Sequence, residues 1–581
     1  MMMRGRLRKT KWLLAGLVVL ALGAWGWVLY PFWGLPFNAE RHGAPPITPA
    51  WALECWVWED DANTAASTRE LLEDYKKNDF PVRTVLIDSP WSTRYNDFEV
   101  DQQRFPDPGA FFRGLQDDGY RVVLWMTSMV NSESKDTAKS EDSAWFQSAA
   151  DQGFLINYGE KVKWWKGRGG SIDYANPEAI KWWRGMQNQV LEWGVDGWKL
   201  DGTDPYALSW LGKIPFPYVR THEGWMSSRR YADHYYRDEY HHGLEKNPEF
   251  ITLARSIDSP MPWSHPEGYA PIDSAPVTWV GDNQHTWNDA DRGLERALKC
   301  ILRSAELGYN VIGSDVAGYH GAEPIPPEIY IRWAQFSTFC GLFLNGGHGE
   351  RRMSFRSPEE LSVIRKFSWL HTELVPYMYS HGVEAHEGAR PLMRPLKGGD
   401  YHYLFGNDFL VAPFHEPGTQ RTVHLPEGEW RYLFDDRELI SGPTVLTRDF
   451  SLQEFPVYVR EGAVIPMRIS REYTGIGQND WEGQVVWNLY PKGKTSFTLH
   501  HPDESGIMIA TCDALGAQIT VTLEGVVTPH ILRIYAEKKP SGIECNGAML
   551  EEGKDWEYRE AQHRVIVRSK EKRSMVYVLR N

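Results

Sequence analysis

Short apolar runs alternate with amphipathic stretches of helical period between residue 51 and about residue 385. Eight runs predict strands: WALECWVWE (51–59), TVLID (84–88), RVVLWM (121–126), VDGWKLD (195–201), FITLARS (250–256), VTWVGD (277–282), YNVIGSD (309–315) and FCGLFLN (339–345). Ser67 and Glu70 have the spacing of a capping box, which predicts a helix that begins near Ser67. This repeated alternation predicts a closed (β/α)8 barrel, the TIM barrel, over residues 51–385. An open doubly wound sheet is the rival, although no GxGxxG motif follows the first strand to support a dinucleotide-binding fold.

After about residue 385 the pattern changes to short strands rich in β-branched residues, separated by frequent turn signals. Examples are RTVHLPEGEWRYLF, FPVYVREGAVIP and AQITVTLEGVV. Such segments are typical of small β-sandwiches. We therefore predict a proximal β-sandwich at residues 386–475 and a distal one at residues 476–581.

The N-terminal segment has the pattern of a membrane anchor. Residues 1–11 contain five basic and no acidic residues, and residues 12–30 contain no charged residue. Nineteen helical residues extend about 28 Å, close to the ~30 Å of a bilayer core. The positive-inside rule then predicts a single-pass membrane protein with a cytoplasmic tail (1–11), a transmembrane helix (12–30) and a tether (31–50), its main mass lying outside the cytoplasm. A cleaved secretion signal is the rival interpretation.

Composition narrows the classes of function. The net charge of −14 and the pI near 5.8 argue against nucleic-acid binding, which needs a positive surface. The 27 Trp, 27 Tyr and 23 Phe suit carbohydrate binding, because aromatic faces pack against sugar C–H groups, although any single ring can simply fill the core. The five cysteines form no CxxC motif and indicate no zinc site or disulfide framework. We expect buried free thiols, and we expect neither a metal nor an organic cofactor.

Four aspartates stand at or just past the ends of predicted barrel strands: Asp88, Asp201, Asp282 and Asp315. A single aspartate at such a place is commonly the N-cap of the following helix. The carboxyl ends of barrel strands, however, form one mouth at which active sites assemble. Four aspartates at these ends therefore predict an active site lined by carboxylates.

The segment DGWKLDGTDP, residues 196–205, resembles the nucleophile region of glycoside hydrolase family 31, which includes α-glucosidases, α-galactosidases and α-xylosidases. The resemblance implies that Asp201 is the nucleophile and that Asp204 is the acidic residue three positions later. The segment VTWVGDNQHTW is similar to the family's acid/base segment and implies that Asp282 is the general acid/base.

Other segments extend the resemblance over most of the chain. LARS carries Arg255 where the family has an arginine, while GSDVAGY, LNGGHGERR and TVLIDSPW imply sugar contacts by Asp315, His348 and Asp88. VPYMYS, GARPLMRPL, GNDFLVAP, LPEGEW and FPVYVREGAVIP resemble the family's C-terminal sandwich motifs. Trp125 and Trp279, at the ends of their strands, are added as candidate substrate contacts because indole rings pack against sugars.

The implied chemistry is that of a retaining α-glycosidase. Such enzymes use two carboxyl groups about 5–5.5 Å apart, one as nucleophile and one as acid/base. The nucleophile must stay ionised, so we expect Arg255 or another cation beside it. A dry setting made by Trp279 and Trp287 is expected to favour the protonated form of Asp282.

The sequence departs from the family's pattern at its N-terminal side and in the nucleophile region. The family usually carries a large N-terminal β-sandwich, whereas about 20 residues separate the predicted anchor from the first strand here. The long insert at residues 129–170 either walls the substrate site or is a solvated excursion. Lys199 stands where α-glucosidases of the family have an apolar residue, and it is either a structural ion-pair partner or a contact to a polar sugar substituent. Asp204 replaces a glutamate.

These observations favour an exo-acting α-glycoside hydrolase, with an α-galactosidase-like specificity expected ahead of that of a simple α-glucosidase. One alternative is an α-transglycosylase on the same site, in which a sugar replaces water. Another is a non-catalytic carbohydrate-binding surface receptor, against which the retention of both Asp201 and Asp282 argues.

Overall fold

The computed structural model describes residues 11–24, 26, 41–60, 63–202, 210–211, 214–215, 218–258, 267–320, 324–502, 506–516 and 518–580. The chain forms two compact units. The first comprises Met1–Gly43, Ser89–Arg113 and Leu124–Ala275. The second comprises Ala44–Asp88, Gly114–Val123 and Pro276–Asn581.

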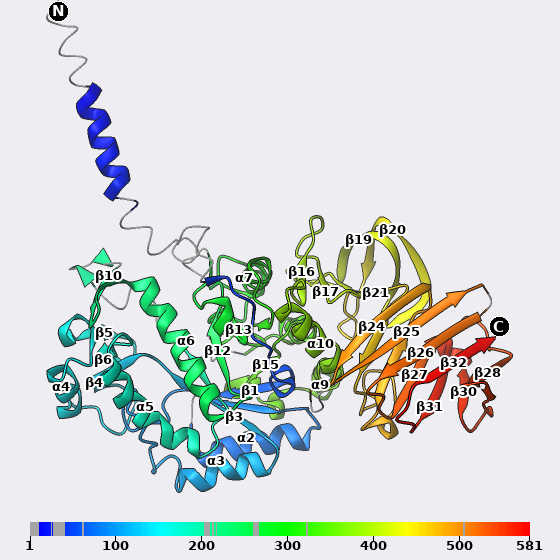
Figure 1. Cartoon of the computed structure of the whole chain (residues 1–581), viewed down its shortest axis with the longest axis horizontal. Coiled ribbons are helices and arrows are strands. Elements are labelled where there is room, and N and C mark those ends of the chain that lie inside the picture. Colours follow the sequence, from blue (N-terminus) through cyan, green and yellow to red (C-terminus); the bar gives the residue numbers. More distant parts are fainter. Residues whose placement is uncertain are drawn as a thin grey trace, which may run out of the picture. The chain divides into compact units, whose positions relative to one another are not determined.

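Eight strands form one sheet in the order β14-β13-β12-β7-β3-β2-β1-β15. Their bounds are β1 Trp56–Glu59, β2 Thr84–Ile87, β3 Arg121–Met126, β7 Gly197–Leu200, β12 Ile251–Arg255, β13 Val277–Trp279, β14 Ile312–Gly313 and β15 Leu344–Gly346. Figure 1 labels β1, β3, β12, β13 and β15 of this sheet. The first strand pairs in parallel with both β2 and β15, and a parallel bridge between Asp315 and Leu344 closes the ring. The predicted barrel is therefore confirmed, and the open doubly wound sheet is excluded.

The barrel strands are short and buried. In β1 the side chains of Trp56, Val57 and Trp58 are at most 1% exposed, and β2 and β7 are buried throughout. A barrel strand has core packing on one face and helices on the other, so its sequence is a continuous apolar run. This explains why the apolar runs alone were sufficient to identify the strands.

Helices follow most of these strands. They are α2 Ala65–Lys77, α3 Pro108–Asp117, α5 Pro177–Glu192, α6 Ser228–Lys246, α7 Leu294–Leu307, α8 Pro327–Thr338, α9 Pro358–Glu373 and α10 Val375–His386. Short 3-10 helices are η2 Ala50–Leu53, η3 Ile156–Gly159, η4 Ile272–Ser274, η5 Gly349–Arg351, η6 Met353–Phe355, η7 Asn479–Trp481 and η8 Glu560–Gln562.

The start of α2 corrects one expectation. Its N-cap is Thr64, whose hydroxyl accepts a hydrogen bond from Ser67 N at 3.0 Å while Thr64 N donates to Ser67 Oγ at 3.1 Å. The capping box thus joins Thr64 to Ser67, and the predicted box from Ser67 to Glu70 is wrong. Ser67 already occupies the third helical position, where its hydroxyl takes the part that Glu or Gln plays in the usual box.

The insert after β3 folds on itself. It contains β4 Met129–Ser134, α4 Ala144–Asp151, β5 Val162–Trp164 and β6 Gly167–Ser171, with the three strands in the order β4-β6-β5. Two further hairpins, β8 Trp210–Leu211 with β9 Ile214–Pro215 and β10 Tyr218–Thr221 with β11 Gly224–Ser227, follow β7. All of these elements belong to the first unit.

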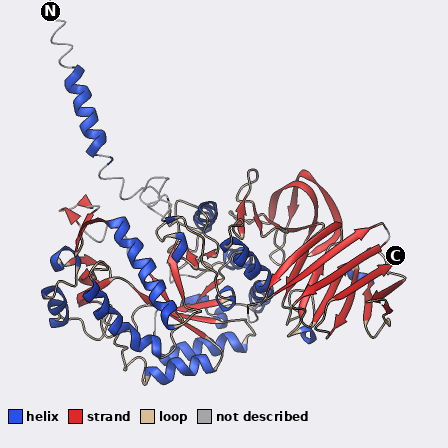
Figure 2. Cartoon of the chain, viewed as in Figure 1, coloured by secondary structure: helices blue, strands red, loops and turns tan. Residues whose placement is uncertain are grey.

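Beyond α10 the regular secondary structure of the described chain is almost all β-strand (Figure 2). A six-stranded sheet has the order β16-β17-β18-β21-β19-β20, a five-stranded sheet β22-β23-β27-β31-β30, and a second six-stranded sheet β24-β25-β26-β32-β28-β29. The strands are β16 Met393–Pro395, β17 Tyr403–Phe405, β18 Phe409–Val411, β19 Gln420–Tyr432, β20 Asp435–Asp449, β21 Val457–Arg460, β22 Val464–Met467, β23 Val485–Leu489, β24 Gly493–His500, β25 Ile507–Leu515, β26 Gln518–Gly525, β27 His530–Tyr535, β28 Gly542–Cys545, β29 Ala548–Met549, β30 Trp556–Arg559, β31 Arg564–Ser569 and β32 Met575–Arg580. The predicted β-rich C-terminal part is confirmed. Strand β22, which precedes the predicted boundary at 475/476, shares its sheet with strands that follow it.

The predicted anchor is only partly described. Residues 11–24 and 26 are helical and exposed apart from a half-buried residue 26, whereas residues 1–10, 25, 27–30 and 31–40 of the predicted tail, anchor and tether lie outside the described residues. Within the described part, no helix combines the length and the apolar character required to span a bilayer. The predicted transmembrane helix is thus not found among the residues that the structure describes. All five cysteines are buried free thiols, as expected.

A buried carboxylate joins α5 to α6 in the first unit. Glu239 on α6 is fully buried, and its two oxygens accept hydrogen bonds from Tyr174 Oη at 2.6 Å, Trp183 Nε1 at 2.9 Å, Arg184 Nη1 at 2.5 Å and Gln187 Nε2 at 2.7 Å. A buried ion is tolerated when an opposite charge and several donors replace its hydration. This network fixes α6, which carries residues of the candidate site.

We predict that Glu239→Ala lowers the free energy of unfolding by about 3–5 kcal/mol, because it leaves the Arg184 guanidinium buried without its carboxylate. Glu245→Ala on the same helix is the control, because Glu245 is mostly exposed and should change the stability by at most about 0.5 kcal/mol. Urea denaturation followed by tryptophan fluorescence measures both variants. Equal stabilities of the two variants would contradict the prediction.

Candidate active site

Asp201 directly follows β7 and lies at the centre of a group of donors in the first unit. Its Oδ1 accepts hydrogen bonds from Arg255 Nε at 3.0 Å, Arg255 Nη2 at 2.8 Å and Gly202 N at 2.8 Å. Its Oδ2 accepts one from Trp125 Nε1 at 3.0 Å. The Asp201 backbone is held as well, because its N–H donates to Met126 O and its carbonyl accepts from Tyr235 Oη at 3.2 Å.

The electrostatics of this group keep Asp201 ionised. Burial raises the pKa of Asp201, but the positive charges of Arg255 and Lys199 and the hydrogen bonds from Trp125 and Gly202 outweigh it and lower the pKa to about 2. A carboxylate with this pKa carries its negative charge throughout the physiological pH range. Arg255 thus stands beside Asp201, where a cation was expected, and Lys199 adds to its effect.

The Arg255 guanidinium is shared between two carboxylates. While Nε and Nη2 face Asp201, Nη1 donates a short hydrogen bond to Asp258 Oδ2. Asp258, three residues beyond Arg255, is buried. Sequence reasoning missed it, although its position just past a barrel strand is the signal that identified the other aspartates.

Two tryptophans of the insert, Trp164 and Trp165, pack beside the residues around Asp201 in the first unit. The rings of Trp125 and Trp164 are stacked with centroids 6.3 Å apart and 7° between their planes, and Tyr95 meets both rings edge-on. Trp165 is half exposed and lies over Gly202. The insert therefore contacts the residues around Asp201.

Gly202 needs to be glycine. Its φ is +66°, and an added Cβ would lie 2.7 Å from Thr127 Cγ2 and 2.9 Å from Trp165. Both the left-handed backbone and the lack of space disfavour any side chain at this position. The close approach lets the insert reach the loop that holds Asp201.

A second group of site residues lies in the second unit. Asp60, just past β1, has its Oδ1 2.7 Å from His348 Nδ1 and accepts a short hydrogen bond from Tyr319 Oη at Oδ2. Arg351 Nη1 approaches His348 Nε2 at 3.3 Å, which favours the tautomer with its proton on Nδ1. Trp58 packs against both the Tyr319 and His348 rings, with centroids 5.1 and 4.7 Å away.

Tyr319 lies within electrostatic range of three carboxylates. Burial raises the pKa of Tyr319, and the negative charges of Asp88, Asp60 and Asp282 raise it further. The structure therefore brings Asp88 and Asp282 together with Asp60, which sequence reasoning missed. Asp60 directly follows Glu59, the last residue of β1, and lies outside the motifs that carried the resemblance. Only its place just past a barrel strand could have identified it.

The remaining predicted residues are placed as follows. Asp315 follows β14 and is 3% exposed, and Trp279 is 1% exposed within β13. Arg292 donates a hydrogen bond to the backbone carbonyl of Asp282 at 2.7 Å. Asp204 lies outside the described residues. Within the described part of the chain, no group of three or more His, Cys, Asp or Glu side chains could hold a metal ion.

Comparison with known protein families decides the family. The model of the glycosyl hydrolases family 31 TIM-barrel domain matches residues 45–381, and that of the family's C-terminal domain matches residues 389–465. The chain belongs to glycosyl hydrolase family 31. The resemblance noted in the sequence is thereby confirmed.

Individual relatives are distant. An α-xylosidase of Emericella nidulans is 25% identical over 74% of this chain and 55% of its own length. An isomaltosyltransferase of Sporosarcina globispora is 21% identical over 88% of this chain and 50% of its own length. The chain thus spans about half the length of these relatives. Among solved structures, a family 31 dextranase of Flavobacterium johnsoniae in complex with glucose has a TM-score of 0.79 at 22% identity, covering 93% of this chain and 72% of the dextranase. At this identity the structure shows a shared fold.

Proposed function

We propose that this family 31 member is a retaining, exo-acting α-glycosidase that removes a terminal α-linked sugar. The observation that carries the proposal is the Asp201 carboxylate, which is buried at the carboxyl end of a barrel strand and yet held ionised by Arg255 and Lys199. A retaining glycosidase needs such a carboxylate as its nucleophile. Family membership supports the same chemistry.

In the proposed reaction, Asp201 attacks the anomeric carbon while Asp282 donates a proton to the departing glycosidic oxygen. The product of this first step is a glycosyl-aspartate ester. Asp282, now ionised, then takes a proton from water, whose oxygen displaces Asp201 and releases the sugar with its original anomeric configuration. The Arg255 guanidinium keeps Asp201 ionised before attack and stabilises it again as it leaves.

The sugar is proposed to contact Asp88, Trp125, Lys199, Asp204, Arg255, Trp279, Asp315 and His348. The contacts described above support positioning roles for two of them, because Trp125 and Arg255 hydrogen-bond to Asp201 itself. Lys199 acts on Asp201 electrostatically, whichever sugar is bound. Its charge also favours a sugar with a polar group near it, for which an α-galactoside is our leading candidate.

A transglycosylase is the second candidate, and its support is the similarity to an isomaltosyltransferase. The two reactions share the glycosyl-aspartate ester and differ in whether water or a sugar hydroxyl resolves it. Incubation with p-nitrophenyl α-galactoside, α-glucoside and α-xyloside, with and without an added acceptor sugar, distinguishes them by their products. No turnover of any substrate would instead favour a carbohydrate-binding receptor.

The roles of the two carboxylates predict opposite products in azide rescue. Asp201→Ala should lose roughly 10³-fold or more in turnover, and azide should restore it by attacking the vacated face to give the β-glycosyl azide. Asp282→Ala should still form the glycosyl-aspartate ester from a substrate with an activated leaving group, and azide should convert it to the α-glycosyl azide. Nuclear magnetic resonance of the products assigns the anomers. Full activity of Asp201→Ala would refute the proposal.

The low pKa of Asp201 predicts a pH effect of Lys199. The nucleophile is active when ionised, so kcat/KM falls as the pH drops through its pKa. Removing a nearby positive charge raises that pKa, so the acid limb of the Lys199→Met profile should move to higher pH. Lys163→Met, at an exposed position in the insert, is the control and should leave the limb in place. An unmoved limb in Lys199→Met would show that Lys199 does not act on the ionising group.

A further inference from the structure

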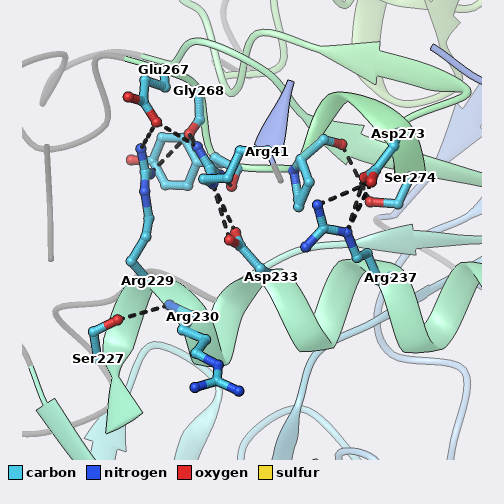
Figure 3. Close-up of polar contacts among 12 residues, drawn as sticks. Arg41, Ser227, Arg229, Arg230, Asp233, Arg237, Glu267, Gly268, Asp273 and Ser274 are labelled. Atoms are coloured by element: carbon cyan, nitrogen blue, oxygen red, sulfur yellow. Dashed lines mark hydrogen bonds and ion pairs between the residues drawn. The ribbon is translucent and has the colours of Figure 1, made fainter. Parts of the chain in front are cut away.

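Arg41, which precedes the barrel in the chain, has its guanidinium buried in the first unit (Figure 3). Nε donates to both oxygens of Asp233 on α6, at 3.0 and 3.1 Å. Nη2 donates to Tyr269 O at 2.7 Å and to Gly268 O at 3.4 Å, while Nη1 reaches Glu267 Oε2 at 3.4 Å. One side chain thus connects α6 with the segment 267–269.

A second arginine completes the cluster. Arg229 on α6 donates to Gly268 O at 2.9 Å and lies 3.7 Å from Glu267 Oε2. The four charged side chains are 1% to 11% exposed and carry two positive and two negative charges. Because buried charges are stable only when paired, this arrangement strongly fixes the position of the segment relative to α6.

The same segment is hydrogen-bonded to the end of β12. Tyr269 N donates to Ser256 O at 3.1 Å, and Ala270 N donates to Arg255 O at 3.0 Å. The two peptide groups with carbonyl oxygens that accept hydrogen bonds from Arg41 therefore also donate hydrogen bonds to the backbone of Arg255 and Ser256. Arg255 in turn places its guanidinium against Asp201, and α6 holds the Asp201 carbonyl through Tyr235.

We propose that Arg41 is a positioning residue that holds the end of β12, and with it the Arg255 guanidinium, against Asp201. This inference rests on the proposed role of Asp201 as the nucleophile. Arg41 lies before residue 45, where the match to the family's barrel model begins, so the contact comes from this chain's own N-terminal segment. Gly43 lets the segment lie close to η4, because an added Cβ would be 2.9 Å from Asp273 Cβ.

The effect on Asp201 follows from the geometry of Arg255. Its guanidinium is divided between Asp201 and Asp258, so a small shift of its backbone lengthens the bonds of 2.8 and 3.0 Å to Asp201. When the pairing with Arg255 weakens, its charge lowers the pKa of Asp201 less and offsets less of the increase caused by burial, so the pKa of Asp201 rises. Misplacement by a fraction of an ångström to one ångström can cost up to about 100-fold in rate.

The test compares Arg41→Met with Arg237→Met in the full chain. Arg237 is the matched control, because it also joins α6 to the connection after β12, through Asp273 at 3.0 Å, but beyond the peptides that bind Arg255 (Figure 3). Arg41→Lys keeps the charge without the forked contacts and should lie between the wild type and Arg41→Met. Glu267→Gln, which weakens the cluster while Arg41 remains, provides a second route if Arg41→Met does not fold.

Two measurements are made on each variant. Hydrogen–deuterium exchange of residues 251–258 should become faster in Arg41→Met and Glu267→Gln but not in Arg237→Met. The acid limb of the kcat/KM profile should move to higher pH in the same two variants, with a loss of about 10- to 100-fold in kcat/KM at neutral pH.

The outcomes separate the hypotheses. A lower melting temperature with unchanged exchange at 251–258 and an unmoved acid limb would show that Arg41 has a merely structural role. The exchange experiment does not need turnover, so it decides whether Arg41 holds β12 even if Asp201→Ala proves active and the proposed function fails. Faster exchange together with an unmoved limb would overturn the proposed link from β12 to Asp201.

Discussion

A carboxylate that is buried and nevertheless ionised has to be surrounded by fixed donors, and this requirement organises the first unit. The donors to Asp201 come from β3 through Trp125, from β12 through Arg255, and from the peptide after β7. They converge because neighbouring barrel strands end side by side. Each of the three strands is fixed by the barrel, so the carboxylate depends on the register of the sheet as much as on any single neighbour.

The second unit satisfies a similar requirement with different chemistry. Here Asp60 is bound by Tyr319 and His348, and the Trp58 ring packs against both partners. Asp201 is thus held by a guanidinium and an indole N–H, whereas Asp60 is held by a phenol hydroxyl and an imidazole.

Sequence patterns predicted the features that follow from a regular local pattern, namely the barrel strands and the residues at their ends. Barrel strands such as β2 and β7 are buried on both faces, so apolar runs marked them and the polar residue after each run marked the mouth. Tyr235 could not be found in this way, because it reaches Asp201 from a helix with a sequence that gives no sign of that contact. The packing of the insert could not be predicted either. Gly167 and Gly169 let β6 lie close to β4, because a Cβ added at these positions would be only 2.1–2.2 Å from neighbouring backbone carbonyl oxygens. Composition does not reveal this tertiary contact.

The charged residues around the site were likewise predicted only in part. Arg255 was expected beside a carboxylate because its motif occurs at a strand end, and it lies there. Asp258 and Asp60 also stand just past strands, but nothing in their surroundings distinguished them from ordinary helix caps. The capping box of α2 shows the same limit within a single turn of helix. The box that forms has Ser67 at its third helical position, where the usual pattern has Glu or Gln, so the sequence rule pointed to Ser67 and Glu70 instead.

The contact of Trp165 with Gly202 determines which changes of sequence the site can accept. A side chain at 202 would have to displace both Thr127 and an indole ring while adopting an unfavourable backbone conformation, so this position is closed to variation. Trp165 is different, because half of its surface faces solvent and its replacement creates no clash. Efforts to redesign specificity by directed evolution can therefore vary residue 165 and its neighbours in the insert, while the loop that carries Asp201 stays constant.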